Sequence, residues 1–267
     1  MKPFSYHTPR TVAEATALLR ADGEAKLLAG GQSLIPVLKL ELAQPSALVS
    51  LARLDGGELR GVRRDGDRLW VGAMTTHAQV ANSDEVKAHL SALAALAGQI
   101  GDPQVRNRGT LGGSIAHADP AADYPAAVVA LAGTVHTDRR TIAADDFFTG
   151  LFSTALAADE IVTGVSFAIP ARAAYAKFPH PASRFAVVGV MVAELAAGNV
   201  RVAVTGAGAS VFRVPAMEAA LAARFAPDAI AGIAVPADDL QSDLDFIAEY
   251  RANLVGVMAR RAVAAAG

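Results

Sequence analysis

Two short segments rich in glycine carry the strongest chemical signal in the sequence. The first is Ala29-Gly30-Gly31-Gln32-Ser33, and the second, Gly109–Ser114, reads Gly-Thr-Leu-Gly-Gly-Ser. Glycine lets the backbone turn tightly and lets an anion approach its N–H groups, and serine adds a hydroxyl donor. A helix that starts after the first segment would also favour a bound phosphate. Two such segments suit a ligand with two phosphates, and hence a dinucleotide; a plain turn is the alternative for the first.

Charged residues flank the second segment on both sides. Arg106 and Arg108 precede it and are either phosphate partners or solvated charges. His117, Asp119 and Asp123 follow it, but one histidine with two aspartates is a weak pattern for a metal site. We therefore expect an aspartate that accepts hydrogen bonds from ligand hydroxyls or caps a turn.

Other nucleotide-binding and hydrolase motifs are absent. The sequence contains no P-loop, and Gly206-Ala207-Gly208 lacks the third glycine of a Rossmann fingerprint. The segment 31–35 lacks the final glycine of a nucleophile elbow. The glycine pattern therefore indicates nucleotide binding without indicating a type of reaction.

The first half of the chain alternates helices and strands around these segments. Thr11 and Glu14 predict a capping box at the start of a helix that ends at Asp22-Gly23, and Asp65-Gly66 predicts a hairpin turn. The other expected elements are a short buried strand (26–29), an apolar helix (34–42), a strand (47–51), two hairpin strands within 59–73 and one helix (84–100). The segment 101–125 shows no regular pattern, and long irregular segments inside compact domains are usually functional or disordered.

In the second half, the pattern of expected elements changes near residue 170, where a connector follows a strand. The expected elements are a strand or short helix (128–135), a strand that follows residues 159–162 and ends at Pro170, a connector (172–183), a hairpin of 185–195 with 200–204, a helix that begins near Pro215 and a long helix (243–265). We place a domain boundary near residue 170. The predicted fold class is α+β.

Composition excludes several classes of protein. Hydrophobic residues make up 52% of the 267 residues, and 24 basic residues nearly balance 26 acidic ones, so nucleic acid is a poor partner. No apolar run reaches the roughly 18 residues of a spanning helix, and the N-terminus resembles no signal peptide. The chain has no cysteine, so it offers no disulfide, zinc thiolate or iron–sulfur ligand. We expect a cytoplasmic protein without a membrane span.

Three stretches resemble the FAD-binding subunit of the xanthine dehydrogenase and carbon monoxide dehydrogenase family of molybdenum hydroxylases. They are AKLLAGGQSLIP (25–36), GDPQVRNRGTLGGSIAHADPAADYPA (101–126) and KFPHPASRFAVVGV (177–190), and the end of the chain, with EYR (249–251) and MARRA (258–262), is also similar. The resemblance implies a two-subdomain, PCMH-type FAD-binding domain over 1–170, divided into about 1–55 and 56–170. It also implies a C-terminal domain, 171–267, with a small antiparallel sheet and helices.

The resemblance also implies a set of cofactor-binding residues and no catalytic or metal-binding ones. The segment that holds the FAD diphosphate carries over to Lys26, Leu27, Ala29, Gly30, Gly31, Gln32, Ser33 and Leu34. The second segment, on the other phosphate side, carries over to Gly112, Gly113 and Ser114, followed by His117 and by Asp123, which would bond cofactor hydroxyls. Ile161 and Val162 would line the isoalloxazine, Lys177 would lie near the flavin ring, and Phe185 would cover one flavin face. Ordinary core packing at the start of a strand is the alternative for Phe185.

The implied function is electron transfer within a larger complex. A molybdopterin subunit would hydroxylate the substrate, an iron–sulfur subunit would carry the electrons to FAD in this chain, and an external acceptor would remove them. The lack of cysteine fits this division, because the clusters must lie in a partner. Two alternatives are a free-standing FAD-dependent oxidase or reductase and a non-catalytic partner that has lost FAD, although both glycine segments are intact.

Overall fold

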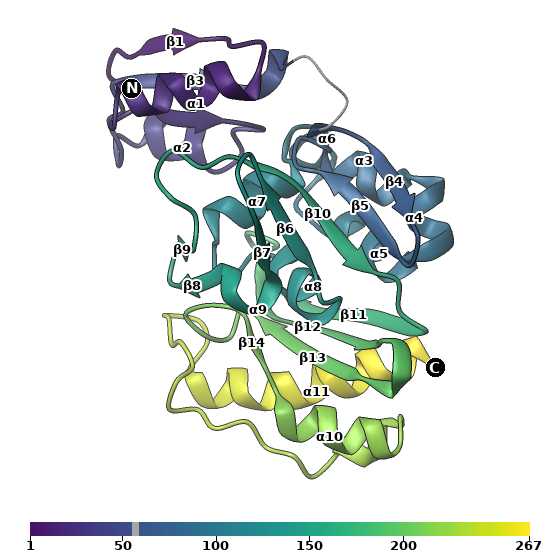
Figure 1. The fold of residues 1–267 in the computed structure, drawn as a ribbon. Helices are drawn as coiled ribbons and strands as arrows, with labels where there is room; N and C mark the ends of the chain where they lie inside the picture. The colour runs from purple at the N-terminus through teal and green to yellow at the C-terminus, as the bar shows by residue number, and fades with distance from the viewer. Residues whose placement is uncertain (55–58) are drawn as a thin grey trace.

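The protein has the expected α+β character, with three main layers along its length (Figure 1). The computed structural model describes residues 1–54 and 59–267, so the expected division between two subdomains at 55 and 56 lies outside the described residues. Within this part of the chain, no helix combines the length and the apolar character that crossing a membrane requires.

The N-terminal unit is a small parallel sheet with helices. Its strands lie in the order β1-β3-β2, so β3 is central and buried at every position. Thr11 caps α1 by accepting from Glu14 N–H. The elements are β1 (Ser5–His7), α1 (Val12–Ala21), β2 (Lys26–Leu28), α2 (Leu34–Lys39), β3 (Ala47–Ser50) and the 3-10 turn η1 (Leu51–Arg53).

The central unit has a five-stranded antiparallel sheet of order β4-β5-β10-β6-β7, which shares one hydrophobic core with the surrounding helices. The helix Pro103–Arg108 is the exception, because it buries no residue. Its core contains the fully buried side chains of Tyr124, Phe147 and Phe167. The strands are β4 (Val62–Asp65), β5 (Arg68–Gly72), β6 (Thr134–Thr137), β7 (Thr141–Ala143), the small pair β8 (Phe148–Gly150) and β9 (Ser153–Thr154), and β10 (Val162–Ala168). The helices are α3 (His77–Asn82), α4 (Asp84–His89), α5 (Ser91–Gly98), α6 (Pro103–Arg108), α7 (Leu111–His117) and α8 (Tyr124–Ala130), with the short α9 (Ala144–Phe147) beside β7.

The C-terminal unit is a four-stranded antiparallel sheet, β11-β12-β13-β14, with α11 across one face (Figure 1). The other face contributes Met191 and Ala203 to the central core, so the two units share buried surface. The elements are β11 (Arg172–Pro179), β12 (Ala186–Glu194), η3 (Ala196–Gly198), β13 (Val200–Thr205), β14 (Phe212–Arg213), α10 (Pro215–Ala223), η4 (Pro227–Ile230) and α11 (Ala248–Ala266).

The single helix predicted over 84–100 is wrong. The chain forms α4 and α5, which are separated at Leu90, where φ is −151° and ψ is 54°. The break redirects the chain, so that α5 is buried on most of its surface while α4 keeps an exposed side. The apolar spacing of Val86, Leu90, Leu93 and Leu96 is satisfied by the core without one continuous helix.

The segment 101–125 is not irregular, because it contains α6, α7 and the start of α8. The side chain of Asp102 caps α6 from the position before Pro103, and Thr110 caps α7 by accepting from Gly113 N–H. These are ordinary helix-start signals that the glycine and proline content of the segment obscured.

The connector predicted over 172–183 is also wrong for most of its length. Residues Arg172–Pro179 form β11, which pairs with β12 along its whole length. Its two charged side chains have partners, since Arg172 binds Glu194 and Lys177 binds Asp123. A strand can hold such residues when each finds an opposite charge.

Smaller corrections concern the ends of elements. Glu14 accepts from Arg10 N–H rather than from the N-cap residue, so the capping box is incomplete. The strand expected at 26–29 is a half-exposed edge strand, because only β3 flanks it. The segment 128–135 divides into the end of α8 and the start of β6. The last helix starts at Ala248 instead of residue 243, because Asp243 accepts from the N–H groups of Asp245 and Phe246 and holds a turn there.

Candidate functional site: a cavity between two glycine-rich segments

Both glycine-rich segments line one cavity between the N-terminal and central units. Its volume is about 510 Å³, within the usual range for small-molecule and cofactor sites. The first segment enters from the end of β2, and the second from the start of α7. The strand–loop–helix order predicted for the first segment is therefore what places it at the cavity.

The two segments touch each other through Gly30. A Cβ atom built on Gly30 would overlap the carbonyl oxygen of Arg108 and lie 2.8 Å from the Cα of Gly109. Only a residue without a side chain fits such a backbone contact. Gly31 adopts φ = +75°, which also favours glycine.

The first segment presents unpaired backbone donors. Among the described residues, the N–H groups of Gly31, Gln32 and Ser33 donate to no protein acceptor, although the residues line the cavity. Three successive free N–H groups form the kind of concave site that binds a phosphate.

The second segment differs, because most of its backbone donors are used within the protein. The N–H groups of Leu111, Gly112 and Ser114 donate to Thr75, Ala73 and Thr110 carbonyls, and Gly113 N–H donates to the Thr110 hydroxyl. Gly112 also lies against Ala73, where a built Cβ would be 2.5 Å from the Ala73 Cβ. This segment therefore offers a small, closely approachable surface and the Ser114 side chain rather than a run of successive free N–H groups.

The structure brings all but one of the predicted site residues to the cavity. Those that line it are Lys26, Leu27, Ala29, Gly30, Gly31, Gln32, Ser33, Leu34, Gly112, Gly113, Ser114, His117, Asp123, Ile161, Val162 and Phe185. Lys177 does not line it. Phe185 is 46% exposed, which is inconsistent with the alternative of ordinary core packing.

Lys177 lies next to a residue of the cavity lining, Asp123. Its Nζ lies 2.9 Å from the Asp123 carboxylate, and the Tyr175 hydroxyl donates to the same carboxylate at 2.6 Å. The side chains of Lys177 and Asp123 are 2% and 5% exposed. Burial raises the pKa of the Asp123 carboxyl, while Lys177 and Tyr175 act in the opposite direction. The pair places a buried carboxylate, with its own cation, in the cavity wall.

The structure gives His117 and Asp119 contacts other than a shared metal ion. Among the residues that the structure describes, no group of three or more His, Asp or Glu side chains could hold an ion. His117 instead packs against Phe152, with ring centroids 5.2 Å apart. Asp119 accepts from Ala121 N–H, which is the turn-capping role that the sequence left open.

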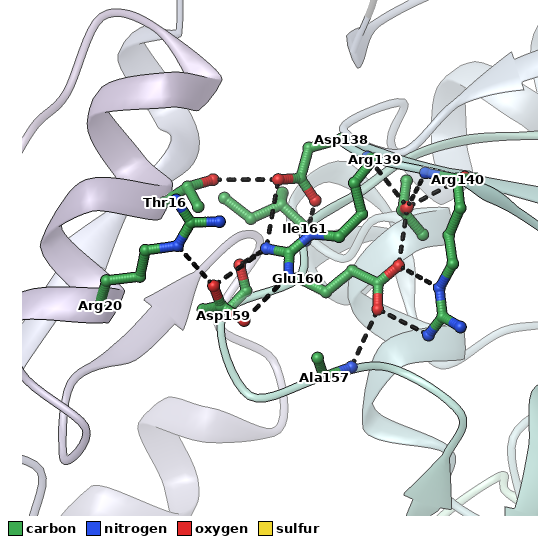
Figure 2. Close-up of polar contacts among 10 residues, drawn as sticks. Thr16, Arg20, Asp138, Arg139, Arg140, Ala157, Asp159, Glu160 and Ile161 are labelled. Carbon is green, nitrogen blue, oxygen red and sulfur yellow. Dashed lines mark hydrogen bonds and ion pairs between the residues drawn. The ribbon is translucent and has the colours of Figure 1, made fainter.

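A polar network fixes the backbone at Ile161 and ties the N-terminal unit to the central one (Figure 2). Asp138 accepts from Ile161 N–H at 2.9 Å and from the Thr16 hydroxyl of α1 at 3.3 Å. Arg20 of α1 binds Asp159 at 2.7 Å. These contacts therefore fix the position of the cavity wall at Ile161 relative to the glycine-rich segment that follows β2.

Glu160, next to Ile161, is the buried part of the same network (Figure 2). It binds Arg140 at 2.8 Å and accepts from Ala157 N–H and the Thr137 hydroxyl. The hydrogen bond from Arg140 lowers the pKa of Glu160 to about 2. The segment before β10 is therefore held by charges that persist at any moderate pH.

Sequence reasoning missed His77, which also lines the cavity. It is the first residue of α3, is 5% exposed, and packs on Tyr124 with centroids 5.3 Å apart. In the part of the chain described, neither His77 Nδ1 nor the Tyr124 hydroxyl has a hydrogen-bond partner. Burial, with a smaller contribution from Arg106, lowers the pKa of His77 to about 4. A buried donor or acceptor without a partner is a place where a ligand or water would bind.

The buried state of His77 predicts a pH dependence of stability. Above about pH 6.5 the imidazole is neutral whether the chain is folded or unfolded, so this contribution is complete. Between about 6.5 and 4 only the unfolded chain takes up the proton, and the free energy of unfolding should fall by about 3 kcal/mol. Urea denaturation of the wild type and His77→Phe across this range measures it. Parallel curves for the two proteins would contradict the assignment.

Comparisons with known proteins agree over the whole chain. Residues 2–171 match the family described as FAD binding domain in molybdopterin dehydrogenase. The nicotine 6-hydroxylase medium subunit of Paenarthrobacter nicotinovorans is 40% identical over 277 residues, covering 98% of this chain and 96% of that protein. The carbon monoxide dehydrogenase medium chain of Hydrogenophaga pseudoflava is 39% identical over 285 residues, with the same coverage. A solved structure of carbon monoxide dehydrogenase from Hydrogenophaga pseudoflava has a TM-score of 0.88 at 37% identity and covers 100% of this chain and 98% of that one.

Proposed function

The chain belongs to the family of FAD-binding domains in molybdopterin dehydrogenases, and from this membership we propose that it passes electrons from iron–sulfur clusters of a partner subunit to an external acceptor. It is the flavoprotein component of an oxidoreductase, and FAD is its cofactor. The medium subunits and chains that it resembles are named as parts of dehydrogenases and hydroxylases.

One observation carries the assignment of the phosphate site. The three free N–H groups of Gly31, Gln32 and Ser33 line the cavity where Gly30 brings the two segments into contact. They would bind the diphosphate of FAD, and the closely packed surface of Gly112 and Gly113 would let the cofactor lie against the backbone. Within residues 1–54 and 59–267, these donors have no protein acceptor.

The remaining predicted residues have physical roles that fit the cofactor. The Asp123 carboxylate, held by Lys177, would accept hydrogen bonds from cofactor hydroxyls. Ile161 and Val162 would form the apolar wall beside the ring system, and the exposed face of Phe185 would cover it and exclude water. Bound FAD supplies the redox chemistry, and these side chains bind and orient it. Lys177 lies behind Asp123, so it would influence the flavin through that carboxylate.

The partners and the domain division are part of the same proposal. An iron–sulfur subunit and a molybdopterin subunit would form a cytoplasmic complex with this chain, because the chain has no cysteine to bind a cluster. We also propose an FAD-binding domain over 1–170 and a C-terminal domain over 171–267. A hydrophobic cluster formed entirely within residues 187–263, on the α11 side of the C-terminal sheet, supports this division. The other face of that sheet packs on the central core through residues such as Met191 and Ala203.

An absorption spectrum of the purified chain tests the function, before and after addition of FAD and then dithionite. We expect a flavin spectrum that bleaches on reduction, with no turnover of candidate hydroxylation substrates by the chain alone. Bleaching by a substrate without any partner subunit would support a free-standing oxidase instead. If no FAD can be extracted from the purified chain after addition of FAD, nor from the co-expressed complex, FAD binding is overturned.

A further inference from the structure

The cavity wall formed by Ser183, Arg184 and Phe185 lies on the loop between β11 and β12. Arg184 is exposed and adopts φ = +63°, so the loop is not held by regular strand pairing. Apart from this loop, the C-terminal unit contributes no residue to the cavity lining. What holds the loop therefore decides how this unit takes part in cofactor binding.

His180 makes most of the hydrogen bonds that shape the loop. Its backbone N–H donates to Phe185 carbonyl at 2.8 Å, and its carbonyl accepts from Arg184 N–H at 2.9 Å. Its side-chain Nδ1 faces the N–H groups of Ala182 and Ser183 at 3.1 and 3.4 Å. Nδ1 must therefore be an acceptor, and the ring proton of the neutral imidazole belongs on Nε2.

Asp245 selects this state of the ring. Its carboxylate lies 3.2 Å from His180 Nε2 and accepts the Nε2 proton. Phe246 packs edge-on against the same ring, with centroids 5.7 Å apart at 80°. Carboxylates commonly fix the tautomer and orientation of a histidine in this way.

The turn that carries Asp245 is itself anchored in the core. Asp243 accepts from Asp245 N–H and Phe246 N–H, and it binds Arg251 of α11. Arg251 is 6% exposed and donates to the carbonyls of Val187 and Gly206, at the ends of β12 and β13 nearest the cavity. A buried cation thus connects the last helix, the turn and the sheet edge.

We propose that His180, oriented by Asp245, is a positioning residue that holds the Ser183–Phe185 wall against the cofactor. The inference rests on the proposed function, because the cofactor in that cavity is FAD. The C-terminal unit then has a defined part in the site. Arg251 anchors the turn 243–246, Asp245 of this turn orients the His180 ring, and His180 holds Ser183–Phe185 in place.

Four variants of the full chain test this proposal: His180→Ala, His180→Asn, Asp245→Ala and the control Asp238→Ala, an exposed carboxylate outside this turn. Loss of the Nδ1 acceptor in His180→Ala should raise the dissociation constant for FAD about tenfold and speed trypsin cleavage after Arg184 by a similar factor. His180→Asn should restore most of both, because an Asn oxygen can accept from N–H groups two and three residues ahead. Asp245→Ala should give a smaller change, about 2- to 5-fold, since the pair is partly exposed.

The two readouts separate this inference from the function it rests on. A wild-type chain that binds no FAD in any assembly would remove the proposed function, while the cleavage of the free loop would still report on His180. If the wild type binds FAD and His180→Ala matches it in affinity and cleavage rate, the positioning role is wrong. Equal defects in the Ala and Asn variants would also overturn it, because the acceptor would then not be the cause.

Discussion

Replacing Gly30 with alanine should weaken FAD binding by about 100-fold or more, corresponding to about 2.7 kcal/mol. The new methyl group would overlap the carbonyl oxygen of Arg108. Neither atom can rotate away, because the backbone fixes the position of a Cβ atom and the oxygen is itself part of the backbone. The two segments would have to separate, which moves the free N–H groups of Gly31–Ser33 from the cavity. The same overlap should lower the free energy of unfolding by about 1–3 kcal/mol.

Gly23→Ala is the matched control for this substitution. Gly23 lies in the same N-terminal unit, and a Cβ built on it meets no atom within 4 Å. Titration of each variant with FAD, followed by flavin fluorescence, gives the affinities, and urea denaturation gives the stabilities. If Gly30→Ala binds FAD as tightly as Gly23→Ala, the contact between the two segments does not shape the cofactor site.

The glycine segments show what a sequence can predict about such a site. Their type and spacing indicated a phosphate ligand, and the structure places both on one cavity. The spacing could not predict that the N–H groups are free in the first segment and mostly used in the second. The donors of Leu111–Ser114 are used by Ala73, Thr75 and Thr110, and only the fold brings the first two of these to the segment. The local pattern of glycine is the same whether its N–H groups are free or satisfied.

Long-range contacts explain the other failures. The apolar spacing does not reveal the break at Leu90, because the apolar residues before and after the break are buried in the same core. The connector over 172–183 is predicted because Pro170, Pro179 and Pro181 lie in or beside this segment. Pairing with β12 nevertheless makes most of it a strand, β11, and its charged Lys177 is satisfied by Asp123, far away in the chain. His77 carried no signal of its own, since its burial depends on Tyr124 and on the approach of Gly109. Patterns of a few residues predict elements and turns, whereas partners across the fold decide which polar residues can be buried.

The second large effect is expected on stability, when Asp123 loses its partner Lys177. Replacing Lys177 with methionine should lower the free energy of unfolding by about 3–5 kcal/mol, because it leaves a buried carboxylate without its cation. The Tyr175 hydroxyl would still donate to Asp123 in this variant, but it carries no positive charge. The loss should be smaller in acid, where protonation of Asp123 removes the uncompensated charge.

The double variant Asp123→Asn/Lys177→Met distinguishes this charge effect from a loss of packing. Without the carboxylate the missing cation is no longer needed, so the double variant should be more stable than Lys177→Met alone. Arg224→Met, which breaks an exposed ion pair with Asp228, should change stability little and serves as the control. Urea denaturation at neutral pH measures the stability of all three variants.

If Lys177→Met is as stable as Arg224→Met, the Asp123–Lys177 pair carries no buried charge, and Asp123 is then neutral in the cavity wall. In that state the Asp123 hydroxyl would donate a hydrogen bond to the cofactor, and the role proposed for it as an acceptor would have to be reversed.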